Sequence, residues 1–169
     1  RLERFLREVI PVAEDSNVRL AMRPNDPPIP SFRGAAQPVR TIADQKRLID
    51  LIDSPSNGIT LDTGVTTEMG EDALEAIRYF GSRDRINHVH FRNVRVDEPY
   101  YKYLEVRHDA GDCDMLGCMK AFQQVGYRYL IIPDHTPEFT NDSAGSQLGW
   151  AFAIGYLRAL KQAAESSAA

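Results

Sequence analysis

Polar and charged residues that could bind a metal ion, move protons or pair with an anionic group stand at the ends of four short apolar segments. They are Arg23, Asn25 and Asp26 after the first segment, Asp62 at the end of the second, His88, His90 and Arg92 in the third, and Asp134 and His135 after the fourth. The carboxyl ends of neighbouring parallel strands meet at the edge where α/β proteins keep their active sites. Asp62, His90 and Asp134 would offer nitrogen and oxygen donors there, which suit Mn²⁺ and, less well, Mg²⁺ or Zn²⁺.

Side-chain alternation along the strands predicts which residues face this site. His88, His90 and Arg92 share one face of an extended segment, whereas Val89 and Phe91 share the other. The apolar face is expected to pack against helices, and the polar face is expected to look inward. By the same parity, Thr60 and Asp62 point inward, and Ile59 and Leu61 point toward the helices.

Each candidate also has a structural interpretation, and both interpretations stay open. A strand histidine such as His90 is commonly a hydrogen-bonded core residue, and His88 lies deeper and is expected to be structural. Asp62 could shape a turn, and Asp134 could orient the His135 imidazole as a carboxylate does for a catalytic base. The others have equally plain alternatives: turn formation for Asn25 and Asp26, a solvated loop for His108, and helix packing for Cys113 and Cys118.

Helical and strand patterns alternate strictly along the chain. Apolar periodicity and capping residues predict helices over residues 1–16, 41–53, 71–80, 113–125 and 145–163. Pro11 is expected to kink or end part of the first helix. Short apolar runs predict strands over residues 18–22, 58–62, 86–92 and 129–133.

Alternating helices and strands indicate a parallel sheet with crossover helices. Either an open doubly wound sheet or part of a (β/α)8 barrel fits this order. A barrel needs eight strands and about 250 residues, so four βα units would make half a barrel with two unpaired strand edges. A missing N-terminal half or a second copy in a homo-oligomer would cover those edges.

The composition predicts one ordinary globular domain spanning residues 1–169. The chain has 43% hydrophobic residues and a net charge of −4, which argues against a nucleic-acid partner. We expect no membrane association, because no apolar run approaches about 20 residues. The start of the chain does not read as a signal peptide. Two cysteines without a CxxC motif favour a reducing, cytoplasmic setting.

Several strings in this order resemble a known family. They are the proline-rich loop 23–28, Asp62-Thr63-Gly64, the V-H-F-R-N-V string over 89–94, the segment from His108 through G-D-C-D-M over 111–115, and Pro133-Asp134-His135. Nearly the whole chain resembles the C-terminal half of mannonate dehydratase, a relative of the xylose-isomerase-like barrels. The resemblance implies a (β/α)8 TIM barrel, of which this chain supplies about four units.

The same resemblance implies a Mn²⁺-dependent lyase that removes water from D-mannonate to give 2-keto-3-deoxy-D-gluconate. His90 and Asp134 match metal ligands of the family, and His135 matches a catalytic histidine. We therefore expect a metal held by Asp62, His90 and Asp134, and catalysis by His135 and Arg92. Substrate binding is expected at Arg23, Asn25, Asp26 and His108.

Two residues depart from the family's pattern. Arg23 stands where the family usually has a histidine ligand, and Asp62 stands where it usually has a cysteine ligand. Aspartate is a good Mn²⁺ ligand, whereas a guanidinium has no lone pair to offer and stays charged. Either the metal is retained and Arg23 grips the substrate carboxylate, or Arg23 replaces the metal by pairing with Asp62, Asp134 or both.

Three functions therefore compete. The first is a metal-dependent sugar-acid dehydratase. The second is a divalent-metal sugar isomerase or epimerase of the same superfamily. The third is a metal-free homologue that binds a sugar acid without catalysis.

Overall fold

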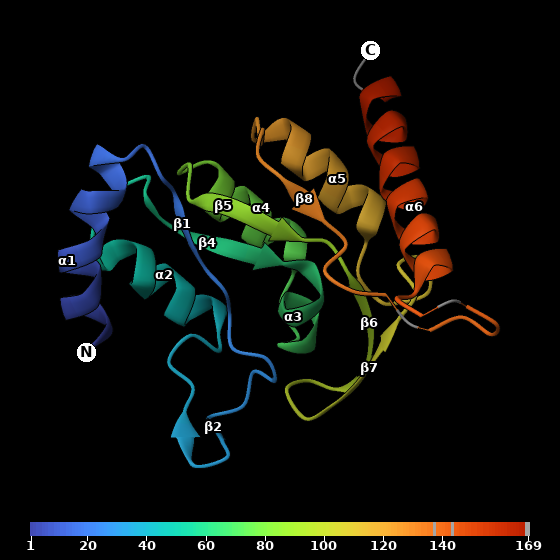
Figure 1. Cartoon of the computed structure of the whole chain (residues 1–169), viewed down its shortest axis with the longest axis horizontal. Coiled ribbons are helices and arrows are strands. Elements are labelled where there is room, and N and C mark those ends of the chain that lie inside the picture. The colour runs from blue at the N-terminus through green and yellow to red at the C-terminus, as the bar shows by residue number, and fades with distance from the viewer. Residues whose placement is uncertain (137, 143, 168–169) are drawn as a thin grey trace.

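Four parallel strands form the central sheet of the computed structural model, which describes residues 1–136, 138–142 and 144–167. The strands are β1 (Leu20–Met22), β4 (Asn57–Asp62), β5 (Ile86–His90) and β8 (Ile131–Ile132), in the order β1-β4-β5-β8 (Figure 1). Every neighbouring pair is parallel, as the alternating sequence pattern predicts. The strands are shorter than expected, since β5 ends at His90 rather than Arg92 and β8 has two residues.

The five expected helices are present as α1 (Leu2–Asp15), α2 (Ile42–Leu51), α4 (Ala73–Gly81), α5 (Met115–Gln124) and α6 (Gln147–Ser166). Thr41, Asp72 and Asp114 cap α2, α4 and α5, each accepting a hydrogen bond from a backbone N–H of the first turn. Pro11 was expected to kink or end part of α1; the helix does not end there but continues through it to Asp15, and a kink at this position stays a prediction. Leu6, Ile10 and Ala13 are buried on both sides of the proline and hold the helix against the core.

A short helix and two hairpins were not predicted from the sequence. Helix α3 (Thr63–Glu68) follows β4 directly, and the hairpins pair β2 (Ser31–Phe32) with β3 (Ala35–Ala36) and β6 (Asn93–Glu98) with β7 (Lys102–Val106). Thr and Gly are weak helix formers, so α3 depends on its cap and on the buried Val65. The β6–β7 hairpin is largely exposed and lacks a continuous apolar face.

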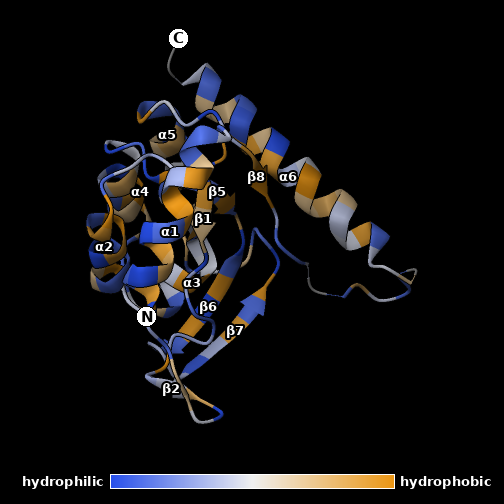
Figure 2. Ribbon diagram, turned by 60° about the vertical axis from the view of Figure 1, so that its left-hand side comes forward, coloured by the Kyte–Doolittle hydropathy of each residue, from blue (hydrophilic) through white to orange (hydrophobic). Residues whose placement is uncertain are grey.

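The hydrophobic core lies on one face of the sheet, and the polar residues lie on the other. Ile59, Leu61 and Val89 pack into the core with apolar side chains from the surrounding helices, and Figure 2 shows these helices with apolar and polar sides. On the opposite face, Thr60 pairs in register with His88 and Asp62 pairs with His90. The predicted alternation is therefore confirmed.

Strands β1 and β8 form the two edges of the sheet within the described residues. The sheet is thus open, and the half-barrel expectation agrees with its four parallel strands. None of the described helices combines the length and apolar character needed to cross a membrane.

Candidate functional site

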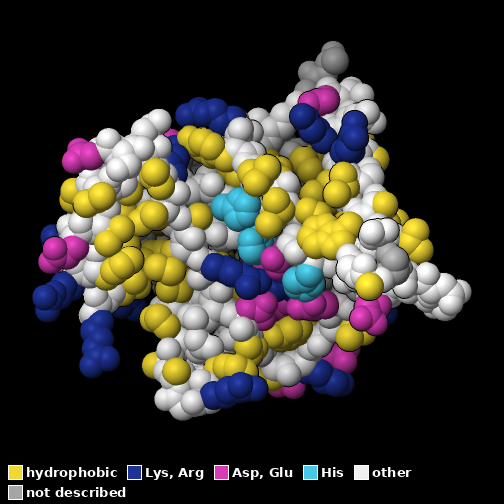
Figure 3. Space-filling view, viewed as in Figure 1, with side chains coloured by type: hydrophobic (Ala, Val, Ile, Leu, Met, Phe, Trp, Pro, Cys, Tyr) yellow, Lys and Arg dark blue, Asp and Glu magenta, His cyan; other side chains and the backbone are white. Residues whose placement is uncertain are grey.

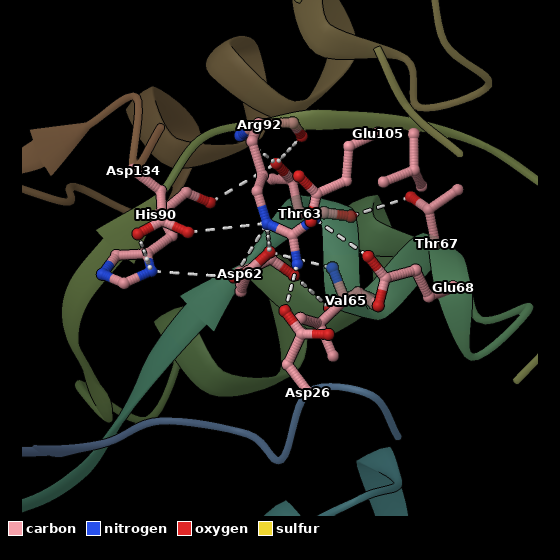
Figure 4. Close-up of polar contacts among 12 residues, drawn as sticks. Asp26, Asp62, Thr63, Val65, Thr67, Glu68, His90, Arg92, Glu105 and Asp134 are labelled. Carbon is pink, nitrogen blue, oxygen red and sulfur yellow. Dashed lines mark hydrogen bonds and ion pairs between the residues drawn. The ribbon is translucent and has the colours of Figure 1, made fainter. Parts of the chain in front are cut away.

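Asp62, His90 and Asp134 lie together at the carboxyl ends of β4, β5 and β8 (Figure 4). His90 Nδ1 is 3.1 Å from Asp134 Oδ1 and 3.6 Å from Asp62 Oδ2. One ligand atom from each residue lies within 4.8 Å of the other two. The structure thus brings together the three residues predicted as metal ligands, and their metal-binding role stays a prediction.

Local backbone structure positions both carboxylates. Asp62 caps α3, where its Oδ1 accepts a hydrogen bond of 2.8 Å from the Val65 N–H, and its other oxygen faces His90. The residue therefore serves the turn and the site at once, so its two sequence interpretations are compatible.

Asp134 adopts the left-handed backbone conformation, with φ of +67°. The His135 N–H donates to the Pro133 carbonyl at 3.0 Å, which closes a three-residue turn around Asp134. Such a turn is rare and costs free energy at a residue other than glycine. From this turn the Asp134 carboxylate faces His90, in keeping with the clustering of strained residues at functional sites.

Arg92 follows β5 and lies at the centre of the acidic site, where its side chain is only 2% exposed. Its guanidinium contacts five carboxylates, at 2.9 Å for Asp26 and Glu68, 3.2 Å for Asp62, 3.3 Å for Glu105 and 3.6 Å for Asp134. Burial opposes its charge, but these carboxylates more than compensate and raise the pKa of Arg92. Gly64 leaves room for this side chain, since a Cβ there would lie 2.8 Å from Arg92 Cγ.

Arg23 extends from the end of β1 into the same cluster. Its Nη2 donates to Asp134 Oδ2 at 3.1 Å and lies 3.6 Å from Asp62 Oδ2. Asp26 is 3.7 Å away. The side chain is 46% exposed, so it reaches the two predicted aspartate ligands from the solvent side.

His135 lies on the exposed side of the site, between two carboxylates. Its Nδ1 is 3.2 Å from Glu105 Oε2, and its Nε2 is 3.5 Å from Asp134 Oδ2. The ring is 43% exposed, which leaves it accessible to a substrate. Asp134 was the carboxylate expected to orient His135, but Glu105 lies nearer to the ring, and the catalytic role of His135 stays a prediction.

Glu68 and Glu105 belong to the site but were missed by the sequence analysis. Glu68 comes from α3 and Glu105 from β7, the elements that the sequence did not predict. The sequence offered one signal that could have pointed to Glu105 as a site residue. Glu105 lies three positions before His108 and shortly before the G-D-C-D-M string.

Asn25 joins two loop segments through hydrogen bonds, whereas the His108 side chain is buried. Asn25 Oδ1 accepts from the Val39 N–H at 2.8 Å, and its own N–H donates to the Val39 carbonyl. His108 is only 1% exposed, and burial lowers its pKa despite the nearby Pro133 and Phe91 carbonyls. The predicted substrate contact of His108 would therefore need the surrounding loop to open.

Neighbouring charges decide the ionisation of the cluster. Burial opposes ionisation of Asp134, but His90 and Arg23 lower its pKa to about 2. Burial also opposes ionisation of Asp62. The interactions with His90 and Arg92 outweigh this effect of burial, so the pKa of Asp62 is lowered. The same two carboxylates overcome burial at His90 and raise its pKa to about 9. Both aspartates are thus anionic at neutral pH.

The donor set of Asp62, His90 and Asp134 fits a divalent ion. Adjacent ligand atoms around an octahedral ion with bonds near 2.1 Å are about 3 Å apart, close to the separation between His90 Nδ1 and Asp134 Oδ1. Metal binding would require His90 to lose its proton and Arg23 to leave the carboxylates. Asp26, Glu68 and Glu105 form a second acidic group, but Arg92 already supplies its positive charge.

The cluster opens onto one face of the molecule. In the space-filling view of Figure 3, histidine side chains gather near the centre of this face beside basic and acidic side chains. The fold and the site together define a class of protein: a TIM-barrel-type α/β protein with a polar, metal-compatible site at the carboxyl ends of its strands.

Comparisons with known proteins identify the family. The family model described as D-mannonate dehydratase (UxuA) matches residues 1–169, and the chain belongs to this family. A mannonate dehydratase of Enterococcus faecalis is 37% identical over 171 residues, which cover 98% of this chain and 47% of that protein. One from Thermotoga neapolitana is 40% identical over 136 residues, covering 78% of this chain and 37% of that protein.

Solved structures agree on the fold. The mannonate dehydratase of Streptococcus suis serotype 2 superposes with a TM-score of 0.89 at 28% identity, covering 99% of this chain and 49% of that chain. A D-tagatose 3-epimerase-like protein superposes with a TM-score of 0.70 at 17% identity, over 99% of this chain and 55% of that chain; this likeness shows the fold alone. The sheet is therefore part of a TIM barrel, and the chain spans about half the length of the curated relatives it matches.

Proposed function

We propose that the protein is a sugar-acid dehydratase that removes water from D-mannonate to give 2-keto-3-deoxy-D-gluconate. The observation that carries this proposal is the convergence of Asp62, His90 and Asp134 at three strand ends in a member of the mannonate dehydratase family. The substrate and the product follow from the family relationship.

A divalent metal, Mn²⁺ by preference, would be held by Asp62, His90 and Asp134. When bound, such an ion polarises a carboxylate and so makes the neighbouring C–H group more acidic. The two ionised aspartates supply the negative charge that attracts it. Mg²⁺ or another divalent metal suits the same oxygen and nitrogen donors less well.

His135 would transfer protons between the substrate and solvent. Its ring is exposed, and Glu105 lies 3.2 Å from Nδ1, so this carboxylate fixes the orientation of the imidazole. Arg92 is too enclosed to reach a substrate from its present position. It would act through the carboxylates that it holds in place.

Arg23 would bind the carboxylate of the sugar acid. It is the more exposed of the two guanidinium groups, and guanidinium matches a carboxylate in charge and geometry. Asp26 lies between the two arginines and would hold both in position, contacting Arg92 at 2.9 Å and Arg23 at 3.7 Å.

The metal-free homologue remains the second candidate, because Arg23 donates to Asp134 and lies close to Asp62. A positive group at this position satisfies the carboxylates without a metal. The isomerase or epimerase alternative is supported by similarity of fold only.

We further infer that strands beyond the described sheet complete the barrel along β1 and β8, contributed by an N-terminal segment or a second copy. A cytoplasmic location is consistent with the free thiols of Cys113 and Cys118. The molar mass of the protein in solution checks whether a second copy completes the barrel, and cell fractionation checks the cytoplasmic location.

The deciding experiment measures metal content and Mn²⁺ binding of the purified protein, together with release of the 2-keto acid from D-mannonate. The parent is expected to bind Mn²⁺ and dehydrate D-mannonate, and Asp134→Ala is expected to lose both. Asp15→Ala, an exposed aspartate on α1, is the matched control and should retain both. A folded parent that dehydrates no sugar acid in the presence of Mn²⁺ would overturn the proposal, and absence of Mn²⁺ binding would favour the metal-free homologue.

A further inference from the structure

Two thiols outside the candidate site lie in contact at the start of α5. Cys113 Sγ and Cys118 Sγ are 3.7 Å apart. Cys113 directly precedes the capping residue Asp114, and Cys118 lies one turn inside the helix. Apolar residues at these two positions commonly pack together and fix the start of a helix. A pair of cysteines provides the same packing and adds redox chemistry.

We propose that Cys113 and Cys118 form a modification site at which a small-molecule disulfide, such as oxidised glutathione, closes an intramolecular disulfide bond. The site is independent of the proposed dehydratase function. It is a reversible redox site of the type found in reducing compartments, where protein disulfides are transient.

The surrounding structure holds the two cysteines in fixed positions next to each other. Asn93 holds the Cys113 backbone on both sides, accepting from the Cys113 N–H at 3.0 Å and donating to its carbonyl at 3.4 Å. Cys118 is fixed within the helix and fully buried. Only four residues lie between Cys113 and Cys118, so little additional chain must be ordered when the ring closes.

The difference in exposure assigns the order of attack. Cys113 is partly exposed and Cys118 is buried, so the external disulfide reaches Cys113 first. The Cys113 pKa is lowered by the Cys118 S–H and the Thr67 hydroxyl, against the effect of burial. The thiolate is the attacking species in thiol–disulfide exchange.

The reaction is balanced by two successive exchanges. The Cys113 thiolate attacks one sulfur of RSSR, forming a mixed disulfide and releasing one RS⁻. The Cys118 thiolate then attacks the Cys113 sulfur, forming the intramolecular bond and releasing the second RS⁻. The two leaving thiolates take up the two protons lost by the cysteines. The protein is oxidised by two electrons, and RSSR is reduced to two RSH.

Formation of the mixed disulfide at Cys113 makes the second exchange easier, because it favours deprotonation of Cys118. The leading cause that raises the Cys118 pKa is its interaction with Cys113, followed by burial. Once Cys113 is part of a mixed disulfide, it no longer carries a charge beside Cys118. Deprotonation of Cys118 then becomes easier, although burial still opposes it.

The test uses oxidised glutathione on the purified protein, followed by quenching of free thiols and mass mapping of the peptides. The parent is expected to lose both free thiols and to yield a Cys113–Cys118 disulfide that dithiothreitol reverses. Cys118→Ala should accumulate glutathione on Cys113, because the second thiol is absent. Cys113→Ala should leave Cys118 unmodified, because that thiol is buried.

Three results would overturn the proposal: stable glutathione addition at Cys113 of the parent without ring closure, persistence of both thiols, or a bond between chains. Circular dichroism of each variant before oxidation checks that it is folded. If Cys118→Ala does not fold, Cys118→Ser provides the same comparison.

Discussion

The competition between Arg23 and a divalent ion is the sharpest consequence of the site geometry. Arg23 Nη2 contacts Asp134 at 3.1 Å and lies 3.6 Å from Asp62, the two carboxylates proposed to hold the metal. Arg23→Gln removes the positive charge and keeps a polar side chain. Arg23→His also removes the guanidinium and adds a nitrogen donor at the same position. Both variants are expected to bind Mn²⁺ more tightly than the parent.

The magnitude follows from the distances and from the exposure of Arg23. A single positive charge about 4 Å from a doubly charged ion repels it by about 2 kcal/mol at the dielectric constant of bulk water. The dielectric constant of bulk water gives the smallest repulsion. This value is appropriate because the Arg23 side chain is almost half exposed and can move away from the ion. Arg23→Gln should therefore lower the Mn²⁺ dissociation constant roughly 10- to 30-fold, and Arg23→His should lower it further.

Isothermal titration of metal-free protein with Mn²⁺, at one pH and ionic strength, measures this effect directly. Arg33→Gln is the matched control, since Arg33 is exposed in the turn between β2 and β3, and it should leave the affinity unchanged. An Arg23→Gln variant that binds Mn²⁺ no more tightly than the parent would refute the competition. Equal affinity of Arg23→His and Arg23→Gln would show that the new imidazole is not a ligand.

Three further predictions concern stability. Burial, opposed by Arg92, raises the pKa of Glu68 from 4.5 to about 7. Between these pH values the folded protein retains a proton on Glu68 that the unfolded chain has lost. The stabilisation from protonated Glu68 is present below pH 4.5, and the free energy of unfolding falls by about 3 kcal/mol as the pH rises to 7. Urea unfolding across this range should show a weaker pH dependence for Glu68→Gln, and an unchanged dependence would contradict the assignment. Gly64→Ala should cost about 1–3 kcal/mol by pushing into Arg92, and wild-type stability in urea would disprove that contact. Phe80→Ala empties a fully buried position in the core and should cost about 3–5 kcal/mol, which thermal unfolding tests; a loss below 1 kcal/mol would be inconsistent with this packing.

The sequence predicted the parallel sheet and the convergence of Asp62, His90 and Asp134. Alternation of helices and strands favours parallel pairing, and parallel strands bring their carboxyl ends to one edge. The two-residue period of a strand then separates His88 and His90 from Val89. These properties depend on local pattern, which is readable without knowing which residues meet in space.

The elements missed were those whose local preferences are weak. Helix α3 has six residues, and its cap is the same Asp62 that faces His90. The β6–β7 hairpin packs beside α3 rather than joining the main sheet. Glu68 and Glu105 come from these elements, so their approach to Arg92 was not visible in the sequence.

By itself, then, the sequence determined the βα order, the inward faces of the two middle strands and the residue types available at the strand ends. Tertiary structure decided which charges meet. It placed Arg92 among five carboxylates, turned Asp134 toward His90 through a left-handed backbone, and brought Arg23 within hydrogen-bonding distance of Asp134. The physical reason is that strand and helix patterns act over a few residues, whereas these electrostatic contacts join residues from separate segments whose approach is set by packing of the whole core.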